Sequence, residues 1–136
     1  MLSPSSNGLG AVTVQAAHLF ATLCLGLVFF QVALVAGAPW GAYTQGGGTP
    51  GRLPPKGRLI AAASIPVLLA IAAAILSAAG FAGGFWPRWT GWAATAAIAG
   101  SAGLNAISQS EPERRLWAPV ATIMAALAGY VMIASR

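Results

Sequence analysis

Four long stretches of this chain contain no Asp, Glu, Lys or Arg, and they limit its possible folds more than any other feature. They are Val12–Ala36, Leu59–Phe81, Trp89–Ile107 and Leu116–Ala134. A helix needs about 20 apolar residues to cross the hydrocarbon core of a membrane, and it satisfies its own backbone hydrogen bonds there. The sequence therefore predicts an all-α fold, an integral membrane four-helix bundle, with one transmembrane domain over residues 1–136 and a flexible tail at residues 1–10.

The composition of the chain agrees with this class. Hydrophobic residues make up 57% of the chain and charged residues only 7%. Soluble domains carry about 25% charged residues, so this chain cannot cover a water-facing surface of normal size. A net charge of +5 would suggest a nucleic-acid partner for a soluble protein. Here the basic residues lie between apolar stretches, where they set orientation and meet anionic lipid headgroups, and no nucleic acid is expected.

The Lys and Arg residues are unevenly divided between the two predicted sides of the membrane. One side has Arg88 and Arg136, and the first and third loops hold the other five: Arg52, Lys56, Arg58, Arg114 and Arg115. Basic residues in short loops remain cytoplasmic, so both chain termini are expected on the extracytoplasmic side. Aromatic residues at or near the predicted helix ends are typical of an interfacial belt. These are Trp40, Tyr43, Trp86, Trp89, Trp92 and Trp117.

The connection between the first two spans, Ala36–Arg58, is unusually long and rich in Gly and Pro. Helix connections in bundles usually have about 2–8 residues. Trp40 and Tyr43 can anchor its first half at the membrane interface, and its three basic residues can hold the second half to headgroups. We expect a loop along the cytoplasmic surface that is ordered at both ends and loosest at Gly46–Gly48. It is either a docking site for a partner, together with the turn at Ser110–Arg115, or a topological spacer.

The two acidic residues of the chain, Glu111 and Glu113, precede the fourth span. Glu111 can pair with Arg115 at i,i+4 if the helix continues through them, although Pro112 favours a turn. Alternatively, both carboxylates can meet the basic residues of the first loop, or remain solvated beside headgroups.

Small residues dominate the third span and predict close helix packing. Ala96 and Gly100, and Ala99 and Gly103, form two small-xxx-small pairs, a pattern typical of helix interfaces in membranes. The third helix is therefore expected to be enclosed by its neighbours or by a partner subunit. The first helix, rich in Leu and Phe, is expected to face lipid.

Polar residues inside the spans are the candidate functional residues, because such groups usually face a bundle interior. Gln15, His18 and Thr22 share one helix face, as do Ser101, Asn105 and Ser108, and Gln31 stands alone. They either form interhelical hydrogen bonds or line a conduit for a small molecule or ion. His18 could instead hold a haem or a chlorophyll-type pigment, although the sequence offers no second ligand and no metal site is predicted.

Several segments resemble a family of small four-span bacterial integral membrane proteins of uncharacterised activity. They are "AGAPWGAYTQGG", "RLPPKGRL" and "NAISQSEPERRLWAPV". The resemblance implies a bacterial inner (plasma) membrane and four helices, and it transfers no activity, cofactor or catalytic residue.

The sequence contains no nucleophile–base pair, phosphate loop or metal-ligand spacing, so an enzyme is not expected. The preferred interpretation is an accessory or structural subunit, or a homo-oligomer, that acts by packing with a membrane-protein partner and lipids. The alternative is a small-molecule or ion carrier lined by the intramembrane polar residues, and a pigment- or haem-binding subunit is the third.

Overall fold

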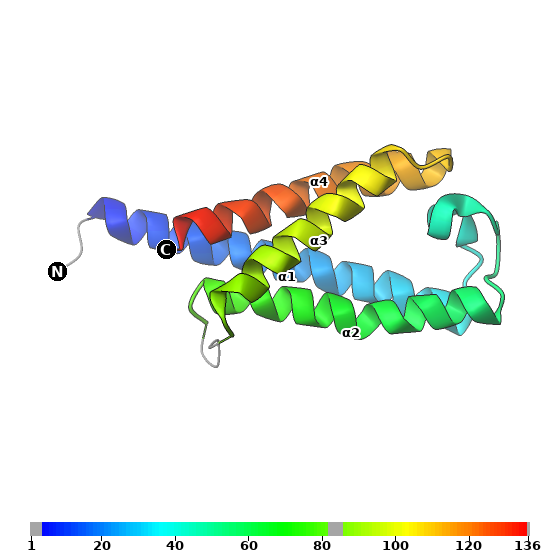
Figure 1. The fold of residues 1–136 in the computed structure, drawn as a ribbon, viewed down its shortest axis with the longest axis horizontal. Helices are drawn as coiled ribbons and strands as arrows, with labels where there is room; N and C mark the ends of the chain where they lie inside the picture. Colours follow the sequence, from blue (N-terminus) through cyan, green and yellow to red (C-terminus); the bar gives the residue numbers. More distant parts are fainter. Residues whose placement is uncertain (1–3, 82–85, 136) are drawn as a thin grey trace.

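The structure is a computed structural model that describes residues 4–81 and 86–135, with only the backbone described at residues 4–9 and at Gly46. The described chain is all-α, as predicted (Figure 1). Its helices are α1 (Pro4–Ala36), α2 (Pro55–Ala78), α3 (Arg88–Ala106) and α4 (Glu111–Ala134), with two short 3₁₀ turns, η1 (Gly41–Tyr43) and η2 (Gln45–Gly47), between α1 and α2.

Three helical segments of the described chain are long and apolar enough to cross a membrane. They are Gly10–Ala36, Pro55–Ala78 and Glu111–Ala134. α3 is not among them, because it contains Arg88 and Asn105 and is otherwise built mainly from Ala, Gly, Ser and Thr.

Three helix boundaries differ from the prediction. α1 begins at Pro4, so most of the expected tail at residues 1–10 is helical, and residues 1–3 lie outside the described part. α2 begins at Pro55, because a proline without an N–H fits the first turn of a helix. α4 begins at Glu111, since the Ser110 side chain accepts a hydrogen bond from the Glu113 N–H and caps the helix.

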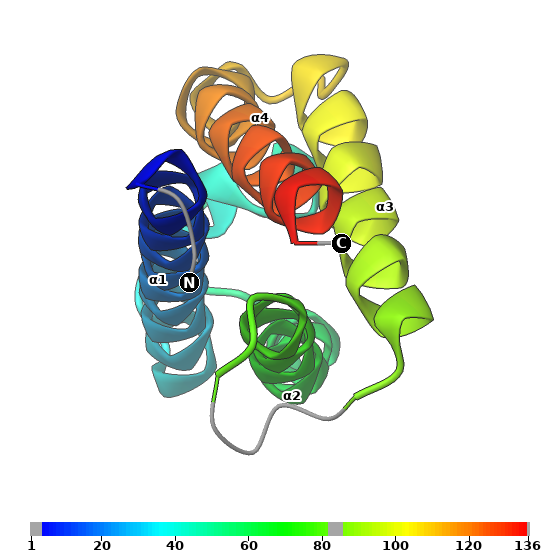
Figure 2. The same ribbon diagram turned by 90° about the vertical axis from the view of Figure 1, so that its left-hand side faces the viewer.

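The helices form two antiparallel pairs, α1 with α2 and α3 with α4, that pack against one another (Figure 2). The core contains Phe20 and Cys24 of α1, Ile75 of α2, and Met124 and Met132 of α4, all fully buried. The expectation that α1 mainly faces lipid is therefore wrong for one of its faces. Phe29, on the opposite face, is 80% exposed.

α3 packs along α4 and makes fewer contacts with α2. It starts beside the end of α2 and ends beside the start of α4, so it runs diagonally across the bundle (Figure 1). At the α2 end, Gly91 lies so close to Met132 that a Cβ there would overlap the methionine sulfur. The Arg88 guanidinium donates to the Met132 carbonyl and to Ser135 Oγ (3.2 Å), which fixes the start of α3 to the end of α4.

The small-residue face of α3 points away from the rest of the bundle. Ala96, Ala99, Gly100 and Gly103 are all exposed, and no described atom lies within 4 Å of a Cβ built on either glycine. The expectation that neighbouring helices of the same chain enclose this face is wrong. Ile98 and Ala94, on the other side of α3, make its core contacts instead.

Candidate ligand-binding cavity

A cavity of about 600 Å³, partly open at the surface, lies between the helices where α2 and α3 diverge. Its apolar wall includes Val67, Ile71, Ile98 and Met124. Polar side chains from all four helices and the first loop also line it: Gln31, Thr44, Gln45, Ser64, Ser101, Asn105 and Glu113. The cavity therefore combines an apolar body with a polar region drawn from distant parts of the sequence.

Small side chains explain why this space is left open. Ala63 and Ser64 on α2, and Ala97 and Ser101 on α3, line the cavity, and none of them is long enough to fill the gap between the two helices. Ala63, Ala97 and Ser101 are also exposed. The cavity therefore opens sideways between α2 and α3.

The long first loop closes the end of the cavity. Ser110 Oγ donates to the Ala42 carbonyl (2.5 Å), and Trp117 Nε1 donates to the Tyr43 carbonyl (2.7 Å). Gln45 Nε2 donates to the carbonyl of Gly57 on α2 (2.8 Å). The loop thus crosses from the α1–α2 pair to the start of α4, which requires more chain than a direct helix connection.

The glycine-rich centre of the loop is packed against α4. A Cβ at Gly47 would lie 2.5 Å from Ser110 Cβ, and Gly47 has a positive φ of 71° that favours glycine. Gly41 is buried, and its N–H donates to the Gly51 carbonyl (2.8 Å). The glycines at 41 and 47 therefore allow close backbone approach, a role that the sequence interpretation of a loose centre did not include.

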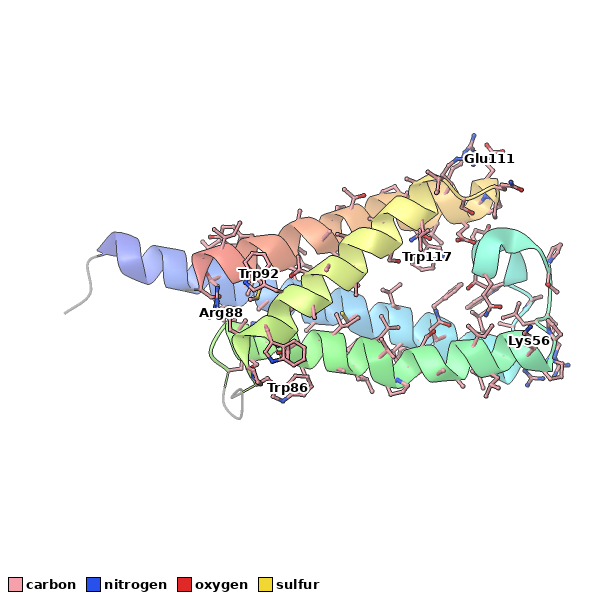
Figure 3. The ribbon with its side chains drawn as sticks, viewed as in Figure 1. Lys56, Trp86, Arg88, Trp92, Glu111 and Trp117 are labelled. Atoms are coloured by element: carbon pink, nitrogen blue, oxygen red, sulfur yellow. The ribbon has the colours of Figure 1, made fainter. Side chains whose placement is uncertain are left out.

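The three basic residues expected in this loop differ in their surroundings, and two of them, Lys56 and Arg58, lie in the first turn of α2. Arg58 donates from Nε (2.9 Å) and Nη2 (2.6 Å) to the Val35 carbonyl, and so stabilises the C-terminal end of α1. The Arg52 side chain lies against Gly37, while Lys56 is exposed near the same end of the molecule (Figure 3). Arg58 is thus a helix cap in addition to any role at headgroups.

Aromatic rings gather beside the polar end of the cavity. Phe30 lies between two tryptophans: it stacks on Trp40 at a centroid distance of 5.8 Å and meets Trp117 edge-on at 4.9 Å. Phe30, Tyr43 and Trp117 all line the cavity. Trp86, Arg88 and Trp92 lie at the opposite end of the molecule (Figure 3). Trp86, Trp89 and Trp92 are exposed there, so aromatic residues occur at both ends of the bundle.

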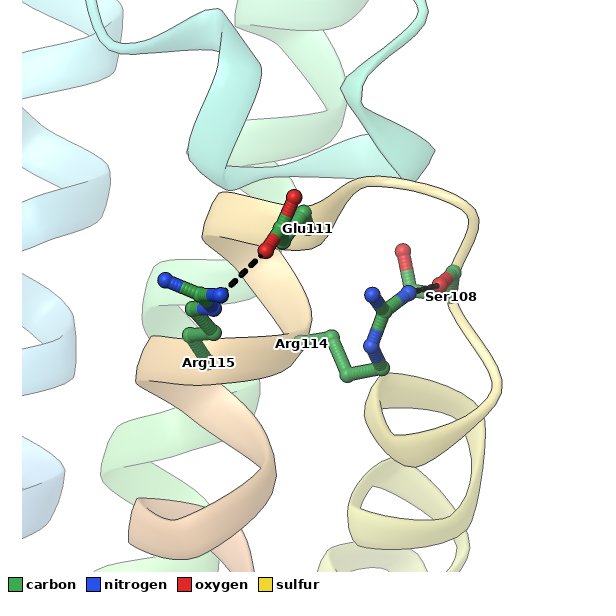
Figure 4. A network of polar contacts seen from close by, with 4 residues as sticks. All are labelled: Ser108, Glu111, Arg114 and Arg115. Carbon is green, nitrogen blue, oxygen red and sulfur yellow. Dashed lines mark hydrogen bonds and ion pairs between the residues drawn. The ribbon is translucent and has the colours of Figure 1, made fainter.

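Glu111 and the arginines after it form a local surface network (Figure 4). Glu111 pairs with Arg115 one turn later on α4 (2.5 Å), and Arg114 donates to the Ser108 carbonyl (2.7 Å). Of the arrangements predicted for Glu111, the structure has the i,i+4 ion pair with Arg115. The helix continues through these residues because Pro112 lies in its first turn and does not interrupt it. Ser108 belongs to this turn, and its hydroxyl accepts from the Ser110 N–H (3.1 Å).

Glu113 differs from Glu111 because it points into the bundle. It is 9% exposed and lines the cavity. Helical spacing explains this orientation: Glu113 lies on the same face of α4 as Trp117, Met124 and Ala128. The sequence interpretation grouped Glu113 with the surface charges. The helical spacing of Glu113 from the apolar residues of α4 could have indicated that its side chain faces inward.

The intramembrane polar residues divide into two groups. Gln31 and Asn105, which are half-buried, and Ser101, which is exposed, line the cavity. Gln15, His18 and Thr22 do not reach it and are exposed on α1, so the expectation of an interior position is wrong for them. The Thr22 hydroxyl donates to the His18 carbonyl (2.9 Å), and the His18 ring meets Phe81 edge-on at 4.6 Å. Among the described residues, no three His, Cys, Asp or Glu side chains are grouped to hold a metal ion.

Comparisons with protein-family models, with curated proteins and with solved structures found no match for this chain. The resemblance to four-span bacterial proteins therefore stays a prediction. What the structure does establish, over residues 4–81 and 86–135, is an all-α fold with three helices long and apolar enough to cross a membrane.

Proposed function

We propose that this chain is a multi-pass membrane protein that binds a small amphipathic molecule in the cavity between α2, α3 and α4, and carries or senses it. The main support is the cavity itself. Its volume of about 600 Å³ falls within the range of about 300–1,000 Å³ usual for small-molecule sites. An apolar wall with a few convergent polar groups is also typical of such sites.

In this proposal α3 completes the bundle as a fourth span. Its 19 residues give a length of about 28 Å at 1.5 Å per residue, close to the thickness of the hydrocarbon core. The polar groups of Ser101 and Asn105 would then face the cavity rather than lipid. The sideways opening between α2 and α3 would admit a molecule directly from the bilayer.

A cavity-filling substitution tests this function. Ala97→Trp places an indole at the opening between α2 and α3, and it should weaken binding of an octyl-chain amphiphile at least about tenfold, since the ligand and the new ring need the same space. Ala126→Trp is the matched control, because Ala126 is an exposed alanine on α4 outside the cavity lining. Calorimetric titration in maltoside micelles, corrected for protein-free micelles, measures the binding. Equal affinities of the two variants would contradict the proposal.

The orientation in the membrane follows from the charges. The first loop and the α3–α4 turn lie at the same end of the bundle, and the start of α1 and the end of α4 lie toward the other end (Figure 1). We place the basic loop end in the cytoplasm of a bacterial cell and the termini outside the inner membrane, as the positive-inside rule favours. Tags at each terminus should react with an impermeant reagent in intact spheroplasts. Labelling only after lysis would reverse the orientation.

The exposed small-residue face of α3 favours a second candidate function, that of an accessory subunit or homo-oligomer. Ala96, Ala99, Gly100 and Gly103 would let another helix approach closely. Native mass spectrometry of the detergent-solubilised protein tests this candidate. A discrete oligomer or a co-purified partner would support it, and a monomer alone would count against it.

A further inference from the structure

We propose that the amphipathic ligand of this cavity carries a cationic ammonium head, held by Glu113 and the neighbouring aromatic residues; this inference rests on the proposed binding function. Glu113 is the one charged residue among the described residues that line the cavity. It is 9% exposed, and Glu111, the other acidic residue of the chain, lies outside the cavity.

The aromatic lining supports the same choice of head group. Phe30, Tyr43 and Trp117 line the cavity together with Glu113. The Phe30 ring is held in place by its contacts with Trp40 and Trp117, at 5.8 and 4.9 Å between ring centroids. Aromatic faces attract cations, and cages of aromatic rings are a recurring means of binding quaternary ammonium groups. A carboxylate beside aromatic residues therefore favours an ammonium over an anionic or neutral head.

The order of residues along the cavity places the two parts of the ligand. The polar and aromatic residues lie toward the loop end, where Tyr43, Thr44 and Gln45 close the cavity and Glu113 lies in the first turn of α4. Val67, Ile71 and Ile98 lie further along α2 and α3. An ammonium head would occupy the loop end, near the membrane interface, with its apolar chain between α2 and α3.

Three probes with the same chain separate head-group preference from cavity binding. They are octyltrimethylammonium, octyl alcohol and octyl sulfate, each titrated into the protein in maltoside micelles with protein-free micelles as the blank. The wild-type protein should bind the ammonium probe at least about tenfold more tightly than the sulfate probe, because Glu113 attracts one head and repels the other. Equal affinities for the three probes would overturn the cation inference and leave the cavity function standing. If none of them bound, the proposed function itself would fail.

Two isosteric variants assign the preference to one residue. Glu113→Gln keeps the shape and removes the charge, so the preference for the ammonium probe over the sulfate probe should fall several-fold, to what the aromatic rings alone contribute. Glu111→Gln removes the same charge from the same turn of α4 and should leave the preference unchanged, since Glu111 lies outside this cavity. Glu113→Asp, which retains a carboxylate, should keep part of it. A preference left undiminished by Glu113→Gln in a protein with an unchanged thermal midpoint would overturn the role of Glu113.

Discussion

Replacing Phe20 with alanine is expected to lower the free energy of unfolding by about 3 kcal/mol or more. Phe20 is fully buried in the core, beside Cys24 and the residues that α2 and α4 contribute. Truncation leaves a cavity whose walls lose their van der Waals contacts, and these contacts are a main source of helix association in a membrane. Thermal or denaturant unfolding in maltoside micelles measures the change.

Phe29 provides the matched control on the same helix. It is 80% exposed on the opposite face of α1, so Phe29→Ala should change the stability by less than about 0.5 kcal/mol. The two substitutions remove the same atoms and differ only in what surrounds them. Similar effects for both variants would contradict the packed face of α1 and would favour the composition-based expectation that this helix mainly faces lipid.

The sequence predicted the helices well because long apolar stretches without charged residues favour helices, the form that a membrane would also require. Segments without charged residues must be helical to satisfy their backbone groups in a membrane, and the observed helices overlap all four predicted stretches. The ends were less predictable, because they depend on local contacts. The cap that Ser110 provides for Glu113 begins α4 five residues before Leu116, where the charge-free stretch starts. The spacing of Ser110 and Glu113 is a capping-box pattern, so this boundary was available in the sequence.

The site was less predictable, because helix orientation in a bundle depends on neighbouring helices. α1 carries apolar residues on all sides, so periodicity could not show whether Gln15 and His18 or Phe20 and Cys24 face the core. Gln31 and Ser101 line the cavity, whereas Gln15 and His18 are exposed on α1 outside it. The cavity itself arises from the diagonal path of α3, which no local pattern specifies.

The first loop illustrates the same limit at longer range. Its length and its glycines were evident, and they indicated something more than a short connection. The partners of the loop were not evident, because they are distant in the sequence. Ser110 binds the Ala42 carbonyl 68 residues away, and Trp117 binds the Tyr43 carbonyl 74 residues away. These bonds make the loop a closed end of the cavity. The interpretation as a mere spacer is therefore the less favoured one, although only a loop variant tests it.

Gly41 is the residue at which that test is sharpest. A Cβ at Gly41 would overlap the carbonyl oxygen of Thr49 and lie 2.7 Å from that of Gly51. Both are backbone atoms, which cannot rotate away as a side chain does, so Gly41→Val should force the loop apart at a cost of about 1–3 kcal/mol or more. The shift would strain the hydrogen bonds of Ala42 and Tyr43 to α4, and the end of the cavity would open.

Gly48→Ala is the control within the same loop. No atom lies within 4 Å of a Cβ at Gly48, and the φ of −68° at Gly48 suits any residue. The stability of the Gly48→Ala protein should therefore be unchanged or slightly raised.

Limited trypsin digestion measures loop opening directly, because Arg52 and Lys56 are exposed cleavage sites within or beside the loop. Gly41→Val should be cut several times faster than the wild-type protein, and it should bind the octyl probes more weakly because the closed end of their cavity is lost. Faster cleavage with unchanged binding would mean that the loop is ordered but does not form part of the site. Unchanged cleavage and unchanged binding would contradict the packed loop itself.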